Sequence, residues 1–415
     1  MNVAMNIAKP VHADQIHFAV DGAELLVGGV PLTRLAARVG STPFYAYDRA
    51  LLDERVASLR TALPAALRLH YSVKANPMPA LVRHMAGLVD GIDVASGGEL
   101  RIALDAGRDP RDISFAGPGK TEAELMQAVA AGINIHVESA REIDAVARCG
   151  DLLGTRPRVL VRINPPFELK ASGMRMGGGA KPFGIDSEQV PAHLERIRAL
   201  DLDFHGFHIF SGSQSLKAEA IVECQARSIA LALELADHAP CAPRLLNIGG
   251  GFGIPYFPGE ARLDLAPVAA GLEQGLATVA AALPGAALAI ELGRYLVGEA
   301  GIYVARVLDR KVSRGQVFLV VDGGMHHHLA ASGNLGQVIR KNYPLALGNR
   351  MDAAGAAPCT VTGPLCTPLD ILGENVTLPE AQPGDLVVVF QSGAYGLSAS
   401  PTGFLGHPAP REVLV

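Results

Sequence analysis

A lysine stands near the end of an apolar, β-forming stretch, where the chain must turn. The stretch is Leu67–Pro77, LRLHYSVKANP, and Lys74 precedes its Asn-Pro break. Burial at a strand end lowers the pKa of an ammonium because it disfavours the charged form, and a Schiff base to a carbonyl requires a neutral amine. The alternative is a structural lysine with a buried stem and an amine that reaches water. This stretch alone leaves both interpretations open.

Two further features would complete a site for a phosphorylated aldehyde. The run Ile248–Gly253, IGGGFG, follows a β-forming segment and removes side chains, so that backbone N–H groups could approach a phosphate. Glu291 places a carboxylate in another such segment. Pyridoxal phosphate needs a lysine for covalent attachment, a phosphate cradle and a carboxylate that keeps its ring nitrogen protonated. The combination of these features predicts this cofactor, whereas a glycine-rich turn alone would not.

These residues lie in a region where β-forming and helical segments alternate. From Phe44 to Arg294 we expect eight strands, at Leu67–Ala75, Val89–Ser96, Ile113–Gly117, Ile133–Ser139, Arg158–Asn164, Leu202–Phe210, Arg244–Gly251 and Ala286–Arg294. Helical segments separate them, among them Glu99–Ala106, Thr121–Ala131, Ala140–Arg148, Val190–Leu200, Leu216–His238 and Leu265–Leu283. Eight such units predict a (β/α)8 barrel more readily than the alternative, an open doubly wound sheet.

The barrel prediction has a test within the sequence, because barrel enzymes keep their chemistry at the C-terminal ends of the strands. Polar residues and glycines do gather at these ends. They are Lys74, Asp93 with Glu99 just beyond it, Arg162, His208, the glycine run, Glu291 and Arg294. Each has a structural alternative, since His208 could be a core histidine and Arg162 part of an ion pair. Their coincidence at one rim favours an active site.

After Arg294 the pattern becomes β, which predicts a second, all-β domain. Its expected strands are Ile302–Leu308, Gln316–Asp322, Thr360–Thr362, Asn375–Leu378 and Asp385–Phe390. Two short apolar runs between His17 and Leu32, divided by Asp-Gly and Gly-Gly pairs, predict a hairpin that joins this domain. The expected boundaries are an N-terminal β segment at 15–43, a barrel at 44–294 and a β-barrel or sandwich domain at 295–415.

Composition argues against several other classes of protein. The chain has 415 residues, of which 49% are hydrophobic and 19% charged, enough to bury the cores of two domains. A net charge of −5 argues against binding to nucleic acid. The longest charge-free run, Gln274–Ile290, is broken by Pro284-Gly285, so we expect no membrane span. Five scattered cysteines form neither a disulfide framework nor a metal-ligand spacing, which favours a reducing cytoplasm.

Three consecutive histidines, His326, His327 and His328, invite interpretation as a metal site. Adjacent side chains diverge in direction, and no cluster of carboxylates accompanies them. We therefore expect these histidines at the surface and predict no metal site.

The order of the motifs resembles one family over nearly the whole chain. YSVKANP, DVASGGEL, HIFSGSQ, IGGGFG, ELGRYL, GPLCTPLD and GAYG follow one another as in the fold-type III pyridoxal-phosphate decarboxylases, the group of the diaminopimelate, ornithine and biosynthetic arginine decarboxylases. Within it the chain is similar to the branch associated with exosortase and exopolysaccharide gene clusters and to decarboxylases of carrier-bound amino acids. The stretch Ser172–Asp186, SGMRMGGGAKPFGID, suggests that branch. The resemblance implies an alanine racemase-like two-domain architecture.

The resemblance also implies roles for individual residues. Lys74 would form the Schiff base with pyridoxal 5'-phosphate, His208 would stack on the ring, and Glu291 would pair with the ring nitrogen. The phosphate would be surrounded by Ser213, Gly250, Gly251, Gly293, Arg294 and Tyr395, with Ser211 a rival for the place of Ser213 because HIFSGSQ is longer than the usual family sequence. Asp93, Glu99 and Arg162 match positions near the cofactor and the lysine. Cys366 would come from the other subunit of a homodimer and protonate the carbanion.

One departure from the family concerns the substrate. The acidic residue that usually follows the cysteine, and that helps to bind a distal amine, is Thr367 here. Five residues are expected near the substrate, namely Arg294, Cys366, Thr367, Asp370 and Tyr395. The loss of the acid predicts a small amino acid substrate without a distal ammonium, either free or joined to a carrier protein. The alternatives are diaminopimelate or ornithine decarboxylation proper, an alanine racemase-like reaction, and a non-catalytic homologue, which would be expected to have lost Lys74, Cys366 or the glycine run.

Overall fold

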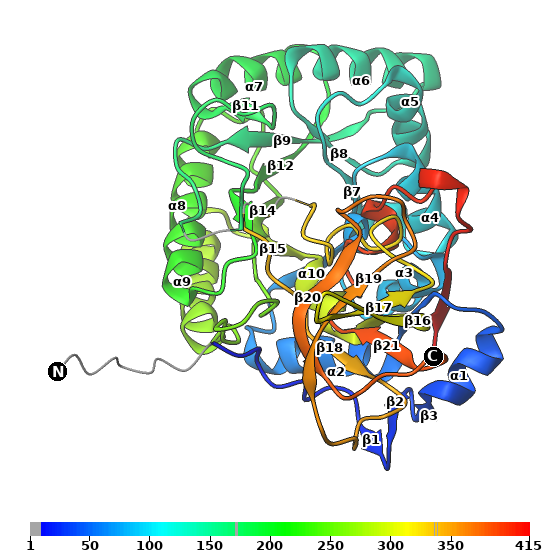
Figure 1. Ribbon diagram of the computed structural model, residues 1–415. Helices are drawn as coiled ribbons and strands as arrows, with labels where there is room; N and C mark the ends of the chain where they lie inside the picture. The colour runs from blue at the N-terminus through cyan, green and yellow to red at the C-terminus, as the bar shows by residue number, and fades with distance from the viewer. Residues whose placement is uncertain (1–9, 171–172, 336, 338) are drawn as a thin grey trace. The chain divides into compact units, whose positions relative to one another are not determined.

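The computed structural model describes residues 10–170, 173–335, 337 and 339–415 (Figure 1). These residues form two compact units. The barrel unit comprises residues 50–254 and 263–297. The β unit comprises the segment that ends at Arg49 together with residues 255–262 and 298–415.

The barrel unit is a closed ring of parallel strands surrounded by helices (Figure 1). In spatial order the ring is β9 (Arg158–Asn164), β12 (Asp203–Ile209), β14 (Leu245–Gly250), β15 (Ala287–Leu292), β5 (Arg68–Ser72), β6 (Gly91–Val94), β7 (Ile113–Phe115) and β8 (Asn134–Val137). Parallel pairing of β8 with β9 closes it. The predicted (β/α)8 barrel is therefore confirmed, and β9 matches its expected span from end to end.

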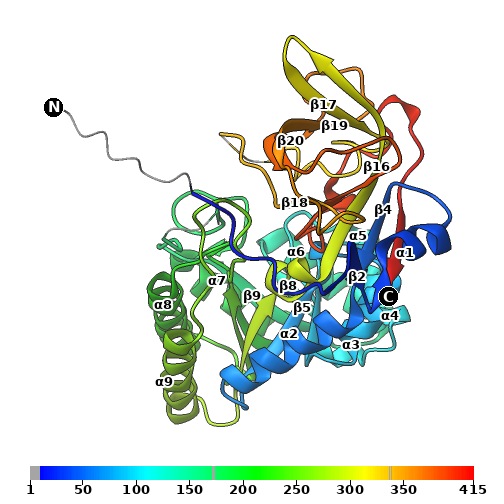
Figure 2. The ribbon, with the colours of Figure 1, turned by 60° about the horizontal axis from the view of Figure 1, so that its bottom comes forward.

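The outer layer consists of helices that cover the strands. They are α2 (Arg49–Ala62), α3 (Pro79–Ala86), α4 (Gly97–Asp105), α5 (Glu122–Ala131), α6 (Ala140–Leu153), α7 (Val190–Ala199), α8 (Ala218–Ala236), α9 (Ala266–Ala282) and the short α10 (Arg294–Val297). Side-chain caps begin several of them; Thr121 and Glu124, for example, cap α5 reciprocally. Helices α8 and α9 pack side by side (Figure 2), with Gly271 allowing close approach to Val222.

Two short strand pairings lie at the rim of the barrel. Strand β11 (Ile185–Asp186) pairs in parallel with the last two residues of β9, beyond the point where β8 ends. Strand β10 (Met174–Arg175) pairs with β13 (Gly212–Ser213), which follows β12. Strands β10 and β11 belong to the predicted Ser172–Asp186 stretch, of which Ser172 itself lies outside the described residues.

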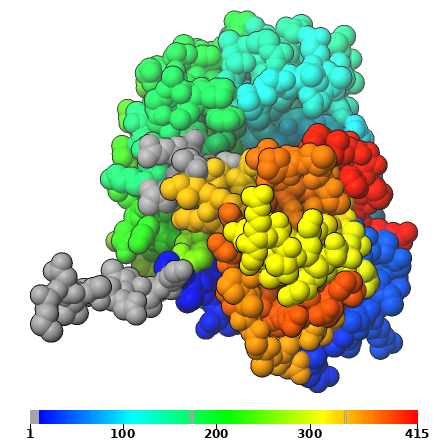
Figure 3. Space-filling view, in the orientation of Figure 1, coloured from blue at the N-terminus to red at the C-terminus, as the bar shows by residue number. Residues whose placement is uncertain are grey.

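The β unit is organised around β16 (Gly301–Ser313). The first half of β16 pairs with β4 (Phe44–Tyr47) and β21 (Leu386–Val389), and the second half pairs with β17 (Gln316–Val321). The other strands of this sheet are β18 (Leu345–Leu347), β19 (Ala357–Thr362), β20 (Ile371–Leu378) and β22 (Arg411–Leu414). In the space-filling view the yellow, orange and blue segments of this unit lie in contact (Figure 3).

The N-terminal segment belongs to this unit, as the two-domain prediction required. It forms β1 (Val20–Asp21), β2 (Glu24–Val27), β3 (Val30–Pro31) and then α1 (Leu32–Val39), a helix that was not predicted. The N–H of Leu25 donates to the carbonyl of Gly348 at 2.7 Å. The expected start of the barrel at Phe44 differs from the structure because β4 pairs with β16 and with β22, which places it in the β unit.

The prediction that His326, His327 and His328 lie at the surface is wrong. All three are buried, with at most 1% of their surface exposed. His327 contacts two tyrosines that are distant in sequence: the hydroxyl of Tyr45 donates to its carbonyl, and the hydroxyl of Tyr303 lies 3.2 Å from its Nδ1. In the described part of the chain, no three His, Cys, Asp or Glu side chains are grouped so that they could hold a metal ion.

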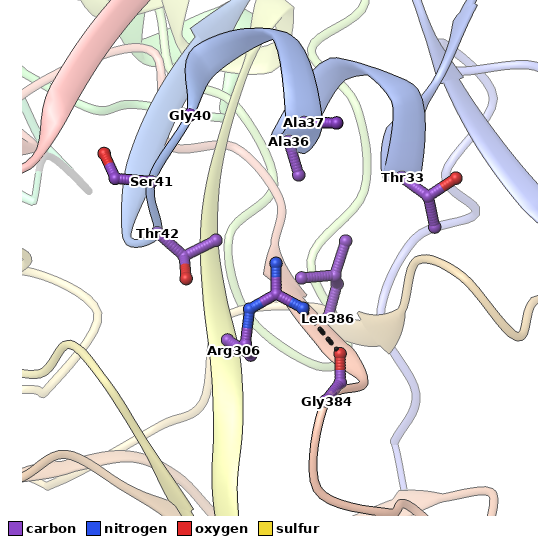
Figure 4. Close-up of a pocket in the computed structure, with 9 residues that line it drawn as sticks. All are labelled: Thr33, Ala36, Ala37, Gly40, Ser41, Thr42, Arg306, Gly384 and Leu386. Carbon is purple, nitrogen blue, oxygen red and sulfur yellow. Dashed lines mark hydrogen bonds between the residues drawn. The ribbon is translucent and has the colours of Figure 1, made fainter.

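A cavity of about 410 Å³ lies in the β unit beneath α1 (Figure 4). Its lining combines small apolar residues with the hydroxyls of Thr33, Ser41 and Thr42 and the guanidinium of Arg306. The guanidinium of Arg306 donates to the carbonyl of Gly384 at 3.0 Å. None of the site residues predicted from the sequence lines this cavity. No helix among the described residues combines the length and the apolar character that a membrane crossing would need.

The first testable prediction concerns the buried histidines and pH. His328 is neutral by geometry, because its Nδ1 accepts the N–H of Ala331 at 3.3 Å, which leaves Nε2 to donate to Ser392 Oγ at 2.9 Å. Burial lowers its pKa from 6.5 to about 3. Below pH 6.5 this histidine is therefore protonated in the unfolded chain but stays neutral in the folded chain. The free energy of unfolding is highest above pH 6.5 and falls as the pH decreases.

We expect the free energy of unfolding to fall by roughly 1.4 kcal/mol per pH unit for His328 as the pH drops below its usual pKa. Denaturant unfolding of His328→Asn at several pH values should show a shallower dependence than the wild type. His238→Asn, at an exposed position after α8, is the matched control. Equal pH dependence in His328→Asn and wild type would contradict the assignment.

Candidate active site

Lys74 lies just beyond the end of β5, in the one-turn 3-10 helix Val73–Ala75. The flanking Val73 and Ala75 are buried, and Tyr71 Oη ties the turn down by donating to the carbonyl of Asn76 at 2.8 Å. The Lys74 side chain itself is exposed, with its amine 5.2 Å from the centroid of the Phe210 ring. The expectation of a lysine desolvated within a strand is therefore wrong, because the turn directs the side chain into an open cavity.

Five of the predicted site residues meet around one cavity of about 210 Å³ in the barrel unit. They are Lys74, Asp93, Arg162, His208 and Glu291, from the ends of β5, β6, β9, β12 and β15. Strand register explains the convergence, since Asp93 pairs with Ser72 and His208 with Arg162 across parallel neighbours. The carboxyl ends of parallel barrel strands meet at one rim, as the sequence predicted.

The carboxylate of Glu291 is ionised although it is buried. Burial raises its pKa, but His208, Lys74 and Arg162 together bring the pKa well below its usual value. Oε1 lies 3.4 Å from His208 Nε2, and Asn247 donates to Oε2 at 3.2 Å. An ionised carboxylate at this place suits a partner that carries a proton on a ring nitrogen.

Two more carboxylates stand near the cavity. Burial raises the pKa of Asp93, and His70, whose Nδ1 lies 3.2 Å from Oδ1, opposes this effect. The other oxygen of Asp93, Oδ2, is buried without a hydrogen-bond partner. Glu99 accepts the N–H of Ala95 at 2.7 Å; burial raises its pKa, and the charge of Lys74 lowers it. The unpartnered Asp93 oxygen at the cavity is a position where a bound group would be expected.

Arg162 is held by a glutamate that the sequence interpretation missed. Its guanidinium donates to Glu138 Oε1 at 2.8 Å, and both side chains are buried. The same carboxylate accepts the N–H groups of Gly117 and Gly184, which belong to two rim loops. Glu138 directly follows β8, so the rule that strand ends carry function would have found it.

The glycine run ends β14 beside Glu291, with which Gly250 is in register. A Cβ at Gly250 would lie 2.3 Å from the Glu291 carbonyl oxygen, and one at Gly251 would lie 2.7 Å from that of Gly212. The N–H of Ser215 donates to the carbonyl of Gly251 at 2.9 Å, which joins the run to the segment after β12. Only glycine fits at these positions, because a side chain would collide with the neighbouring backbone.

The two rival serines differ in their surroundings. The hydroxyl of Ser211 is buried without a hydrogen-bond partner, whereas Ser213 is half-buried in β13. These surroundings do not decide which of the two serines lies near the phosphate. Neither serine is among the residues that line the 210 Å³ cavity, and the same holds for Gly250, Gly251, Gly293 and Arg294.

The remaining predicted residues belong to the β unit. Cys366 is exposed on the loop between β19 and β20, and Thr367 follows it. Asp370 is fully buried, and its two oxygens accept the N–H groups of Met325 at 2.6 Å and Leu365 at 2.8 Å. Tyr395 has φ +52°, a conformation that side-chain-bearing residues rarely adopt and that often marks functional positions.

The residues of the barrel rim fit pyridoxal phosphate. The exposed amine of Lys74 is free to react with an aldehyde, the ionised Glu291 can hold a proton on the ring nitrogen, and the buried Asp93 oxygen lacks a partner. The glycine run follows β14 at the strand end, the kind of position where backbone N–H groups hold phosphates. Fold and site together define a barrel enzyme that uses a phosphorylated aldehyde.

Comparison with known proteins agrees with this class. Residues 49–298 match the family model "Pyridoxal-dependent decarboxylase, pyridoxal binding domain". The chain is 38% identical to L-glutamyl-[BtrI acyl-carrier protein] decarboxylase of Niallia circulans, over 92% of this chain and 90% of that protein. It is 33% identical to diaminopimelate decarboxylase of Aquifex aeolicus, over 94% and 90% of the two chains. The crystal structure of diaminopimelate decarboxylase from Helicobacter pylori complexed with L-lysine is similar with a TM-score of 0.80, 26% identity, and coverage of 92% and 94%.

The chain therefore belongs to the pyridoxal-dependent decarboxylase family. It is an amino acid decarboxylase, and its cofactor is pyridoxal 5'-phosphate. Family membership decides between the decarboxylase and racemase interpretations, and it confirms the resemblance drawn from the motif order.

The second testable prediction concerns Gly293, which follows β15 in ELGR. A Cβ at this position would lie 2.9 Å from Ala75 Cβ, which neighbours Lys74 in its turn. Gly293→Ala should displace that turn, weaken cofactor retention on dialysis, and cost about 1–3 kcal/mol of stability through overpacking. Gly403→Ala, with open space around it, is the control. A Gly293→Ala protein that is as stable as wild type and retains its cofactor equally would refute this packing argument.

Proposed function

We propose that this decarboxylase acts on an amino acid that lacks a distal ammonium and that is joined to a carrier protein. The observation that carries the proposal is the loop Gly363–Asp370. Its only acidic residue, Asp370, is buried with both oxygens bound to backbone N–H groups of its own unit, and Thr367 offers only a hydroxyl. A buried ammonium without a carboxylate partner costs several kcal/mol, roughly, so this loop is a poor receptor for one.

The relatives support the same proposal. The similar protein of Niallia circulans is named as a decarboxylase of a glutamyl group on an acyl-carrier protein. A glutamyl group has a distal carboxylate and no distal ammonium. Diaminopimelate decarboxylation is the second candidate, supported by the 33% identity to the Aquifex aeolicus enzyme.

In the proposed mechanism, residues of the barrel unit hold the cofactor. When bound, pyridoxal phosphate accepts the electron pair left behind as carbon dioxide departs. Lys74 would hold it through the amine, His208 would lie at the ring face, and Glu291 would keep the proton on the ring nitrogen. Arg162, fixed by Glu138, and Asp93 complete the cavity wall.

Other residues would bind the phosphate and move the final proton. Backbone N–H groups of Gly250 and Gly251 and the hydroxyl of Ser213 are proposed for the phosphate, with the side chains of Arg294 and Tyr395. The exposed Sγ of Cys366 would hold the proton that ends on the former α-carbon. We propose that this thiol comes from the partner subunit of a homodimer, as the family resemblance implies, and a cytoplasmic location stays a prediction.

The third testable prediction compares substrates. Carbon dioxide release should be fast with an aminoacyl thioester on a carrier protein and slow with free lysine, ornithine or meso-diaminopimelate. Thr367→Glu should improve turnover of the diamino acids relative to the native substrate, because it restores a carboxylate partner. Thr377→Glu, at an exposed position in β20, is the control for added charge. Decarboxylation of free meso-diaminopimelate by wild type at a typical enzyme rate of about 10 per second would overturn the proposal.

The fourth testable prediction concerns the shared site. In a two-fold dimer with composite sites, an equal mixture of Lys74→Ala and Cys366→Ala chains should recover about a quarter of the wild-type activity, because half the dimers are mixed and each mixed dimer has one intact site. Each variant alone should be inactive. Lys74→Ala mixed with Glu291→Ala is the control, because both changes affect the same unit and no intact site can form. Absence of recovery after confirmed subunit exchange would show that Cys366 acts within its own chain.

A further inference from the structure

A second histidine contacts His208, which lines the cavity, and nothing in the reaction described so far uses it. His136, on β8, is fully buried. It does not line the cavity itself. Its Nδ1 lies 2.9 Å from Nδ1 of His208, and the two rings are tilted by 54° with their centroids 4.6 Å apart. A nitrogen-to-nitrogen contact this short requires one proton between the two rings.

The proton can be assigned from the surroundings of His208. Its other nitrogen, Nε2, faces the ionised Glu291 at 3.4 Å, an ion-pair distance that is long for a hydrogen bond. A carboxylate only accepts protons, so Nε2 of His208 carries one. When Nε2 holds the single proton of a neutral His208, Nδ1 is bare and must accept. In that state His136 is the donor, through Nδ1–H, whereas an imidazolium His208 would itself donate to His136.

The groups around His136 agree with a neutral donor. Burial brings the pKa of His136 well below its usual value, and the charges of Lys120 and Arg162 act in the same direction, whereas Glu291 opposes them. The amine of Lys120 donates to the carbonyl of His136 at 2.7 Å, which fixes this part of the backbone. The second nitrogen of His136, Nε2, is buried without a hydrogen-bond partner.

We propose that His136 is a positioning residue that fixes the tautomer and the ring plane of His208 beneath the cofactor. Without the Nδ1–H of His136, the Nδ1 of His208 would be a buried acceptor with no partner, and the imidazole could rotate and exchange its two nitrogens. The proposal rests on the proposed role of His208 at the ring face of the cofactor. His136 thus continues the group of polar side chains at the rim into the barrel interior. It lies on β8, the strand next to the one that carries Arg162.

The fifth testable prediction separates this role from simple packing. His136→Phe keeps a ring of similar shape but has no donor, whereas His136→Asn keeps an N–H that can reach a neighbouring ring. We expect His136→Phe to bind pyridoxal phosphate about tenfold more weakly in titrations of the cofactor-free protein, and to lower kcat more than it changes KM. His136→Asn should restore part of both. His205→Phe is the control, because it removes a histidine contact with Asp203 at the opposite end of β12.

A direct measurement on wild-type protein keeps the test valid even if His136→Phe does not fold. With ¹⁵N-labelled histidine, the cofactor-free protein should show His208 as the Nε2–H tautomer, and this pattern should be lost in His136→Phe. An Nδ1–H tautomer of His208 in wild type would overturn the proposal, and so would unchanged cofactor affinity in a folded His136→Phe. Failure of the substrate assignment would leave the tautomer result intact, so the two proposals fail separately.

Discussion

The buried negative charge of Glu291 is the constraint on which the barrel rim depends. An ionised carboxylate inside a protein is stable only when donors and cations surround it. Asn247, His208 and Arg162 meet this requirement from three neighbouring strands. Arg162 is a buried charge in turn, and Glu138 compensates it while also accepting N–H groups from two rim loops. The charge that suits the cofactor ring thus also determines how the loops above the barrel are held.

The eight barrel strands could be predicted because each is a short, largely apolar run with polar residues or glycine at or near its end, a pattern local in sequence. Features set by distant partners could not be. The sequence FYAY of β4 becomes a strand of the β unit because β16 and β22 pair with it, more than 250 residues later. The histidines His326–His328 are buried because tyrosines from β4 and β16 pack over them. A polar tripeptide carries no local sign of this.

The candidate site shows the same division. Strand ends identified Lys74, Asp93, Arg162, His208 and Glu291, which share one cavity. The exposure of Lys74 depends on a one-turn helix whose direction the sequence does not show. His136 and Glu138 are polar residues that alternate with buried apolar residues at the end of β8. This two-residue period could have indicated that both side chains lie on the same face of the strand. The commitment of Asp370 to backbone N–H groups required the folded loop, because only the fold brings Met325 to it.

The discontinuous β unit has a consequence for the order in which the protein can be made. Its central strand β16 needs β4 from the beginning of the chain, and β4 needs β22 from residues 411–414. Almost all residues of the barrel unit lie between these partners, at 50–254 and 263–297. A ribosome therefore completes the barrel while β4 still lacks both neighbours, and β4 presents an open strand edge until residues 411–414 emerge. Translation of residues 411–414 is the step at which the β unit first has all the strands described above and this edge is closed.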